Sequence, residues 1–185
     1  MNVSSPTPKH RVYLAIGCIL LAIGAFFGVV GPLVLNPQNI AWLGGGFDPT
    51  QHYLGWAFFR NSTWSFPLGL NPDFGMDISS SIVYSDSIPL LAFIFKPFAL
   101  LLPNSFQYFG IWLLLCFILQ GYFAWRLVAL LKISPIASLA ASLLFIFSPP
   151  LFWRIGLHAA LVGHWLILAA LYLNFRPRHN GRTLF

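Results

Sequence analysis

Hydrophobic residues in this chain form long, nearly unbroken runs instead of the alternating or one-sided patterns of elements that face water. Four runs approach or exceed the length needed to cross a bilayer core, which is roughly 30 Å thick and takes about 20 helical residues. They cover residues 12–35, about 106–131, about 135–149 and about 156–175. The third run is short, so we expect its ends to recruit neighbouring residues. The pattern predicts an all-α integral membrane protein with about four transmembrane helices.

A fifth apolar run, residues 88–102, is ambiguous because Lys96 and Pro97 stand at its middle. Its hydropathy does not decide whether it spans the membrane, whereas the positive charges do. If it is not a span, the main basic groups share one side, as the positive-inside rule favours; they are Lys9/Arg11, Arg126/Lys132 and Arg176/Arg178/Arg182. We therefore expect cytoplasmic termini and a long external first loop, residues 36–105, that carries short juxtamembrane helices. Within it the run lies along or dips into the membrane surface; a five-span arrangement is the alternative.

Composition agrees with a bilayer environment. The chain is 58% hydrophobic and only 8% charged, whereas soluble domains carry roughly 25% charged residues. Its length of 185 residues suits a single membrane domain. The net charge of +6 comes from small basic groups beside apolar runs, so we expect contact with membrane lipid and no nucleic-acid binding. Cys18 and Cys116 lie inside apolar runs and are predicted to be reduced core residues.

The acidic residues are concentrated in one place. All four are aspartates, at positions 48, 73, 77 and 86, and all fall within the predicted external loop. The predicted spans contain no acid. This distribution makes the loop the part of the chain where we expect chemistry.

A helix is predicted from Pro49 to Arg60, because Asp is a good N-cap and Pro is preferred at the first helical position. It follows a flexible run that contains Gly44–Gly46. Spacings of four place Asp48, His52 and Arg60 on one slowly drifting stripe. Two interpretations remain open. Asp48 either only caps a surface helix, or is a site acid that faces a membrane-surface cavity beside His52.

The other acids carry weaker signals. The alternating Asn71, Asp73, Gly75 and Asp77 hint at a calcium loop, but the glycine required at the sixth position is Met76. Turn and cap roles for Asp73 and Asp77 fit better. Asp86 either caps the short helix that follows it or is a second site acid. No cofactor is predicted, and the spacing does not support a divalent metal ion.

A second external junction, residues 147–158, connects the third and fourth runs. Its two prolines break the helix, after which Arg154 and His158 lie one turn apart, with His164 further along the same element. Such groups at a membrane boundary need partners. They either snorkel or bond across helices, or form an anion site in which Arg154 binds a phosphate. His158 and His164 are six positions apart, which argues against a zinc motif. Gln120, inside the second run, predicts an interhelical hydrogen bond.

Two segments carry a resemblance to the GT-C superfamily of membrane glycosyltransferases. Gly-Gly-Gly-Phe-Asp-Pro-Thr-Gln-His-Tyr, at residues 44–53, matches the place of the first-loop catalytic acid in those enzymes. Ser-Pro-Pro-x3-Arg-x3-His, at residues 148–158, resembles their second external loop, although His158 or His164 stands where many relatives have an acid. More narrowly, residues 47–60 and 148–172 look like an uncharacterised bacterial membrane family placed near these enzymes.

The resemblance implies an inverting glycosyltransferase of the bacterial inner membrane that uses a polyprenyl-phosphate-linked sugar as its donor. Asp48 would be the general base. The other residues with an implied role in substrate binding are His52, Arg60, Asp86, Arg154, His158 and His164.

Known GT-C enzymes have more spans, so this chain matches only the N-terminal part of that fold. The missing part or a partner membrane subunit would supply further contacts. A non-catalytic membrane subunit or lipid-binding scaffold of an envelope assembly is the alternative function. A transporter fits less well, because the spans offer few polar groups.

Overall fold

The computed structural model of the chain describes residues 8–46 and 48–177, which are mostly helical. The chain divides into two compact units, and each is described by itself. The bundle unit comprises Met1–Gly28, Cys116–Ser148 and His164–Phe185, and the loop unit comprises Val29–Leu115 and Pro149–Gly163. The predicted all-α class is confirmed, since the described residues contain only one small sheet, the antiparallel pair β1 (Leu70–Asn71) and β2 (Ser80–Ser81).

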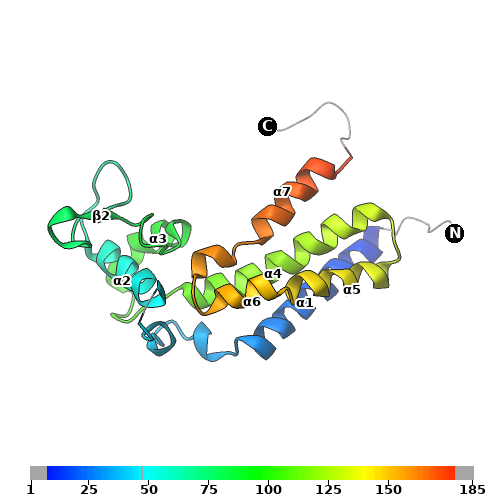
Figure 1. Cartoon of the computed structure of the whole chain (residues 1–185), viewed down its shortest axis with the longest axis horizontal. Coiled ribbons are helices and arrows are strands. Elements are labelled where there is room, and N and C mark those ends of the chain that lie inside the picture. The colour runs from blue at the N-terminus through cyan, green and yellow to red at the C-terminus, as the bar shows by residue number, and fades with distance from the viewer. Residues whose placement is uncertain (1–7, 47, 178–185) are drawn as a thin grey trace. The chain divides into compact units, whose positions relative to one another are not determined.

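The bundle unit is built from long apolar helices, and Figure 1 shows α1, α4 and α5 running beside one another. Its elements are α1 (Pro8–Val29), α4 (Phe109–Val128, of which the part from Cys116 belongs here), the 3-10 helix η5 (Ala129–Leu131), α5 (Pro135–Ile146) and α7 (Trp165–Phe175). Ser134 caps α5 by accepting a hydrogen bond from the Ala137 amide at 3.2 Å, and Pro135 fills the first helical position.

Close packing around Gly121 holds these helices together. A Cβ at Gly121 would lie 2.9 Å from Cδ1 of Ile146 and 3.1 Å from Cβ of Ala22, so a larger residue would push the helices apart. The Cys18 thiol donates to the Gly121 carbonyl at 3.0 Å. Both cysteines are free and buried, as predicted. Gln120 donates to the Phe145 carbonyl at 3.2 Å, which confirms the predicted interhelical hydrogen bond.

Among the residues that the structure describes, two helical segments are long and apolar enough to cross a membrane, Val12–Val29 and Phe109–Leu131. A third is added if α5 and α6 (Pro149–Ile155), which are bent by 41° at their break, form one span. The first helix ends at Val29 and not at residue 35, since Gly31 takes a φ of 84° and Pro32 follows. The predicted span 156–175 is not a continuous helix. Its regular part, α7, begins only at Trp165.

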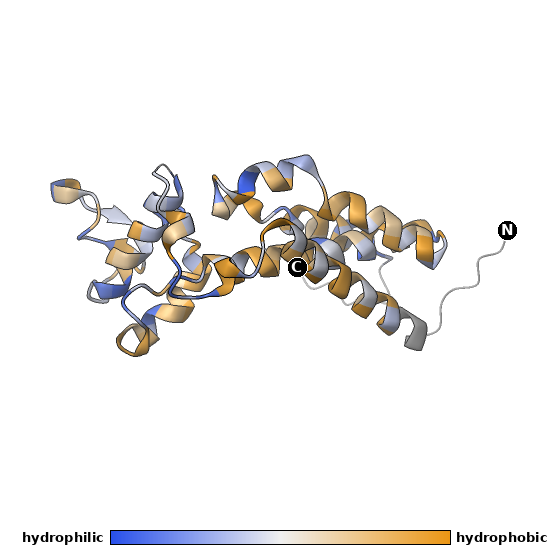
Figure 2. Cartoon of the chain, turned by 90° about the horizontal axis from the view of Figure 1, so that it is seen from below, coloured by the Kyte–Doolittle hydropathy of each residue, from blue (hydrophilic) through white to orange (hydrophobic). Residues whose placement is uncertain are grey.

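The loop unit carries the shorter elements. They are the 3-10 helices η1 (Leu33–Leu35), η2 (Ala41–Leu43), η3 (Met76–Ile78), η4 (Lys96–Leu101) and η6 (Ala159–Val162), the helices α2 (Asp48–Asn61), α3 (Pro89–Phe95) and α6, the two strands, and the start of α4. The helix predicted from Pro49 to Arg60 is confirmed as α2. In Figure 2 the long helices are mostly orange, while blue positions are frequent in the loops and short elements of this unit.

The core of the loop unit is aromatic, with bonds from side chains to backbone joining its segments. Trp56, fully buried on α2, donates through Nε1 to the Phe106 carbonyl at 3.0 Å. Gln107 donates to the Val34 carbonyl at 2.7 Å. Gly110 lies so close to Val34 that a Cβ there would overlap the Val34 carbonyl oxygen. These contacts fix where α2 and the segment before α4 lie within the unit.

Lys96, at the middle of the ambiguous apolar run, is buried inside the loop unit. Its Nζ donates to the Phe59 carbonyl at 2.6 Å and to Oγ of Ser62 at 2.8 Å, and lies 3.8 Å from the centre of the Phe59 ring. Burial lowers the pKa of the Lys96 ammonium. Because the protein itself satisfies this charge, the segment exposes only apolar side chains on its outer face, namely Leu90, Ile94, Phe98, Leu100 and Leu101. At Pro89–Leu101 it is one of the shorter apolar helices, below the length of a span.

Candidate functional site

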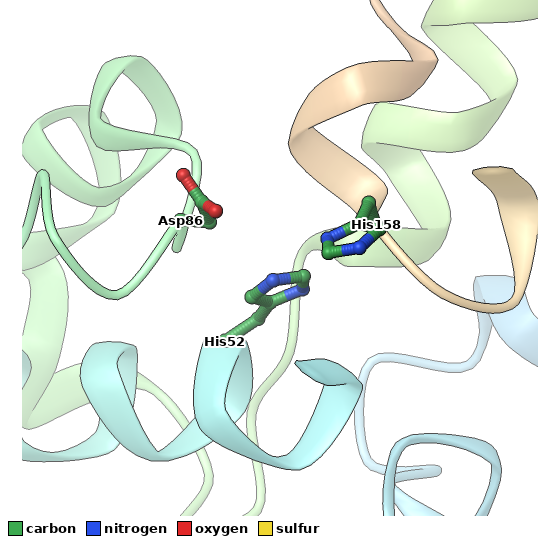
Figure 3. A group of neighbouring side chains, drawn as sticks. All are labelled: His52, Asp86 and His158. Carbon is green, nitrogen blue, oxygen red and sulfur yellow. The ribbon is translucent and has the colours of Figure 1, made fainter. Parts of the chain in front are cut away.

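Three side chains from distant parts of the sequence meet in the loop unit. His52 comes from α2, Asp86 from the loop before α3, and His158 from the segment after α6 (Figure 3). Each offers one ligand-type atom, and these atoms all lie within 4.8 Å of one another. We call this group the His52–Asp86–His158 cluster.

Asp48 adds a second carboxylate next to the cluster. Its Oδ2 lies 3.0 Å from Nε2 of His158, and 41% of the Asp48 side chain is exposed to solvent. The sequence predicted an acid beside His52. The Asp48 carboxylate does act electrostatically on His52, and it also pairs with His158, whose side chain is 32% exposed. An accessible carboxylate in contact with an imidazole can accept a proton or orient the ring.

His52 is the buried member of the cluster, with 2% of its surface exposed. Its ring is stacked with Phe109 at 6.5 Å between centroids, and its Nδ1 has no hydrogen-bond partner within the described part of the chain. Burial lowers the pKa of His52, and His158 lowers it further, whereas Asp86 and Asp48 raise it. The net direction of the His52 pKa is downward from the ordinary value of 6.5, which favours the neutral ring.

The loop that carries Asp86 is fastened to α2. Oγ of Ser87 donates to the His52 carbonyl at 2.6 Å, and the Tyr108 hydroxyl donates to the Ser87 carbonyl. Asp86 and Ile88 both adopt positive φ, 51° and 49°, which is unusual for a β-branched residue such as Ile and marks a locally constrained backbone. The N-cap residue of α3 is Ile88, with no side-chain cap bond. The interpretation of Asp86 as a helix cap is therefore wrong, and the carboxylate instead joins the cluster.

Gly55 makes the close approach of this loop possible. It lies on α2, one turn after His52, and a Cβ there would overlap the side chains of Ser85 and Ser87. The two serine hydroxyls are themselves hydrogen-bonded at 2.7 Å. A glycine is therefore required at this point for the loop to bring Asp86 to His52.

His158 is held by the turn that ends α6. Its amide donates to the Arg154 carbonyl at 2.9 Å, and Nε1 of Trp112 donates to the neighbouring Ala159 carbonyl at 2.6 Å. The half-buried Arg154 guanidinium makes no hydrogen bond or ion pair with the residues that the structure describes. His164 was expected on the same element as Arg154 and His158. That expectation is wrong, because α6 ends at Ile155 and His164 belongs to the bundle unit, just before α7.

Arg60 lies apart from the cluster, at the other end of α2. Only 9% of it is exposed, and its two Nη atoms donate to four backbone carbonyls; these belong to Ala99, Leu102, Pro103 and Asn104, at 2.8–3.3 Å. The last carbonyls of a helical segment lack partners within it. Arg60 supplies partners for a carbonyl of η4 and for the three carbonyls that follow its end, so its role is structural.

Replacing Arg60 with Lys tests this assignment. An ammonium group cannot reproduce a planar fork that reaches several carbonyls, so we expect Arg60→Lys to destabilise the loop unit by about 1–3 kcal/mol. Thermal unfolding of the purified protein in detergent measures the loss. A variant with unchanged stability that binds phosphate groups more weakly would instead support the substrate role predicted from the sequence.

The cluster itself was missed by the sequence analysis, which assigned its members to separate features. The one available signal was the spacing of four between Asp48 and His52, which places both on the same side of a helix. No spacing in the sequence connects Asp86 or His158 to them.

Comparisons with known proteins give a family and no function. No curated protein and no solved structure matches the chain. A family model described as a domain of unknown function, DUF6311, matches residues 19–184, and this match includes every residue of the cluster. The chain therefore belongs to the DUF6311 family.

Proposed function

We propose that this chain carries the donor site of an inverting membrane glycosyltransferase that uses a polyprenyl-phosphate-linked sugar. The observation that carries the proposal is the accessible carboxylate of Asp48, at the start of α2 and 3.0 Å from Nε2 of His158. An acceptor hydroxyl can approach such a carboxylate from solvent, and the adjacent imidazole keeps it oriented.

The proposed reaction needs one base and a means to stabilise one leaving anion. The acceptor oxygen attacks the anomeric carbon while its proton passes to Asp48. The bond between that carbon and the phosphate oxygen breaks, and the lipid phosphate leaves with the bonding electron pair. Attack opposite the leaving group inverts the anomeric configuration. General base catalysis of this kind contributes about 10²–10⁴-fold to the rate.

Arg154 is the group best suited to the departing phosphate. It stands four positions before His158 in the same unit, and its guanidinium is not engaged by the described residues. A planar guanidinium can bind two phosphate oxygens at once and stabilise the charge that develops as the bond breaks. The N–H group of the His158 imidazole is a further hydrogen-bond donor in the same unit.

The lipid part of the donor requires a bilayer beside the site. The exposed apolar face of α3 and η4 suits the membrane surface, and the two long apolar helices suit its interior. We propose that the loop unit lies at the external face and both chain ends in the cytoplasm, as the distribution of basic residues favours.

A non-catalytic lipid-binding scaffold is the second candidate. The same exposed apolar face of α3 and η4 favours it, because lipid contact alone requires no acid. The two functions differ in what they demand of Asp48. A scaffold tolerates its loss, whereas the transferase does not.

The test is a turnover assay with the complete gene product in proteoliposomes. A panel of polyprenyl-phosphate sugars is supplied together with envelope extract as the source of acceptors, and released polyprenyl phosphate is quantified by mass spectrometry. We expect release from at least one donor that depends on both protein and acceptor. A correctly inserted, folded protein that turns over none of the donors would contradict the proposal and favour the scaffold.

A further inference from the structure

We propose that His52, Asp86 and His158 bind a single divalent transition-metal ion of the zinc class. This site is an inference from geometry and chemistry, and it stands independently of the glycosyltransferase proposal. Neither the sequence motifs nor the family match assigns a metal to this chain.

The separation of the ligand atoms is the first argument. In a tetrahedral zinc site, with bonds of about 2.0–2.1 Å to nitrogen or oxygen, neighbouring ligand atoms lie about 3.3 Å apart. The three atoms of the cluster all lie within 4.8 Å of one another. A contraction of at most about 1.5 Å, within the reach of side-chain rotation, is enough to bring them around one ion.

The buried nitrogen of His52 is the second, independent argument. His52 is 98% buried, and its Nδ1 has no hydrogen-bond partner in the part of the chain that the structure describes. Buried polar atoms without a partner are rare and costly. Figure 3 shows the His52 ring pointing into the space that Asp86 and His158 also face. A metal ion in that space would satisfy the nitrogen.

The local charge is the third argument. Asp86 and Asp48 bring two carboxylates to the two imidazoles, and a divalent cation would neutralise them. The two buried cations among the described residues of the unit, Arg60 and Lys96, do not neutralise these carboxylates. Both are hydrogen-bonded to backbone carbonyls outside the cluster. Asp48 also matches the outer partner that metal-binding histidines generally have, a carboxylate in contact with the ring.

The donor types select the class of metal. Two imidazoles and one carboxylate suit zinc and its transition-metal neighbours, whereas magnesium and calcium prefer all-oxygen sites. Three protein ligands also leave a coordination position open, as in catalytic zinc sites. Such an ion could bind a water molecule or a phosphate oxygen there.

Binding is measured with the metal alone. The full chain is purified in detergent, treated with a chelator, and titrated with Zn²⁺ in the presence of excess Mg²⁺. We expect one Zn²⁺ per chain, a raised unfolding temperature on addition of Zn²⁺, and an absorption spectrum typical of tetrahedral nitrogen and oxygen ligation when Co²⁺ replaces Zn²⁺.

Variants of the three ligands distinguish this site from others. Asp86→Asn, His158→Ala and His52→Ala should each weaken Zn²⁺ binding at least tenfold. Asp86 is exposed and therefore the variant least expected to disturb folding. His164→Ala is the matched control, since His164 is not one of the three residues of the cluster, and it should bind Zn²⁺ like the wild type.

The proposal is overturned if no stoichiometric Zn²⁺ binds to the folded wild type, or if folded Asp86→Asn binds it unchanged. Because binding is measured without turnover, failure here is distinguishable from failure of the proposed reaction. Glycosyl transfer by a protein that binds no metal would overturn only the metal site. Metal binding without transfer from any donor would overturn only the transferase.

Discussion

Replacing Asp48 with Asn should lower the rate of glycosyl transfer by about 10²–10⁴-fold, the usual contribution of a general base. The amide keeps the size of the side chain and its suitability for the start of α2, but it cannot accept the proton of an attacking hydroxyl. Insertion into the membrane and the unfolding temperature should change little, since 41% of the Asp48 side chain is exposed. Turnover of the best donor in proteoliposomes measures the effect.

The matched control is Asp77→Asn. Asp77 belongs to the same unit but is exposed in η3, and it is not part of the cluster. It should retain turnover within a few fold of the wild type. If Asp48→Asn also retains turnover at that level, Asp48 serves only as a helix cap and a partner of His158, and the proposed mechanism fails.

Replacing Gly55 with Ala should disrupt the cluster without altering any of its members. The added methyl group would overlap the side chains of Ser85 and Ser87, which fasten the Asp86 loop to α2. Overpacking of this kind typically costs about 1–3 kcal/mol. We expect a lower unfolding temperature together with at least tenfold weaker Zn²⁺ binding, because the loop must move away from His52 to make room.

Gly45→Ala is the control for this variant. A Cβ at Gly45 would meet nothing within 4 Å, so stability and Zn²⁺ binding should both stay close to the wild type. If Gly55→Ala lowers stability but binds Zn²⁺ as tightly as the wild type, the loop does not set the position of Asp86. If Gly55→Ala changes neither stability nor Zn²⁺ binding, the close packing of Gly55 against Ser85 and Ser87 contributes to neither property.

Local features of the fold could be predicted because their causes are local. The helix α2 begins where Asp48 and Pro49 favour a helix start. The longest apolar runs became long helices, although Gly31 and Pro32 end the first one early. The prediction of one continuous helix over residues 156–175 was wrong, because hydropathy alone does not show where a helix is interrupted. Here the regular helix α7 begins only at Trp165, after a break that follows α6.

The charged residues show the limit of sequence reasoning. From the sequence, Lys96 argued against a transmembrane span and Arg60 was a candidate for substrate binding. An unpaired charge in an apolar setting either destabilises that setting or serves a function. In the structure both are buried and bonded to backbone carbonyls. Which carbonyls a long side chain reaches depends on how α2 packs against η4, and no local pattern specifies that.

The sequence by itself determined the helical class, the apolar runs, the start of α2 and the concentration of acids in one loop. These follow from residue preferences and from the free energy of placing each side chain in lipid or water, which depend on near neighbours in the chain. Only the tertiary structure brought His52, Asp86 and His158 within 4.8 Å of one another and paired Asp48 with His158. Their meeting depends on the serine hydrogen bonds to α2, on the space beside Gly55 and on the bond from Trp112 to Ala159. Each of these contacts joins segments far apart in the sequence.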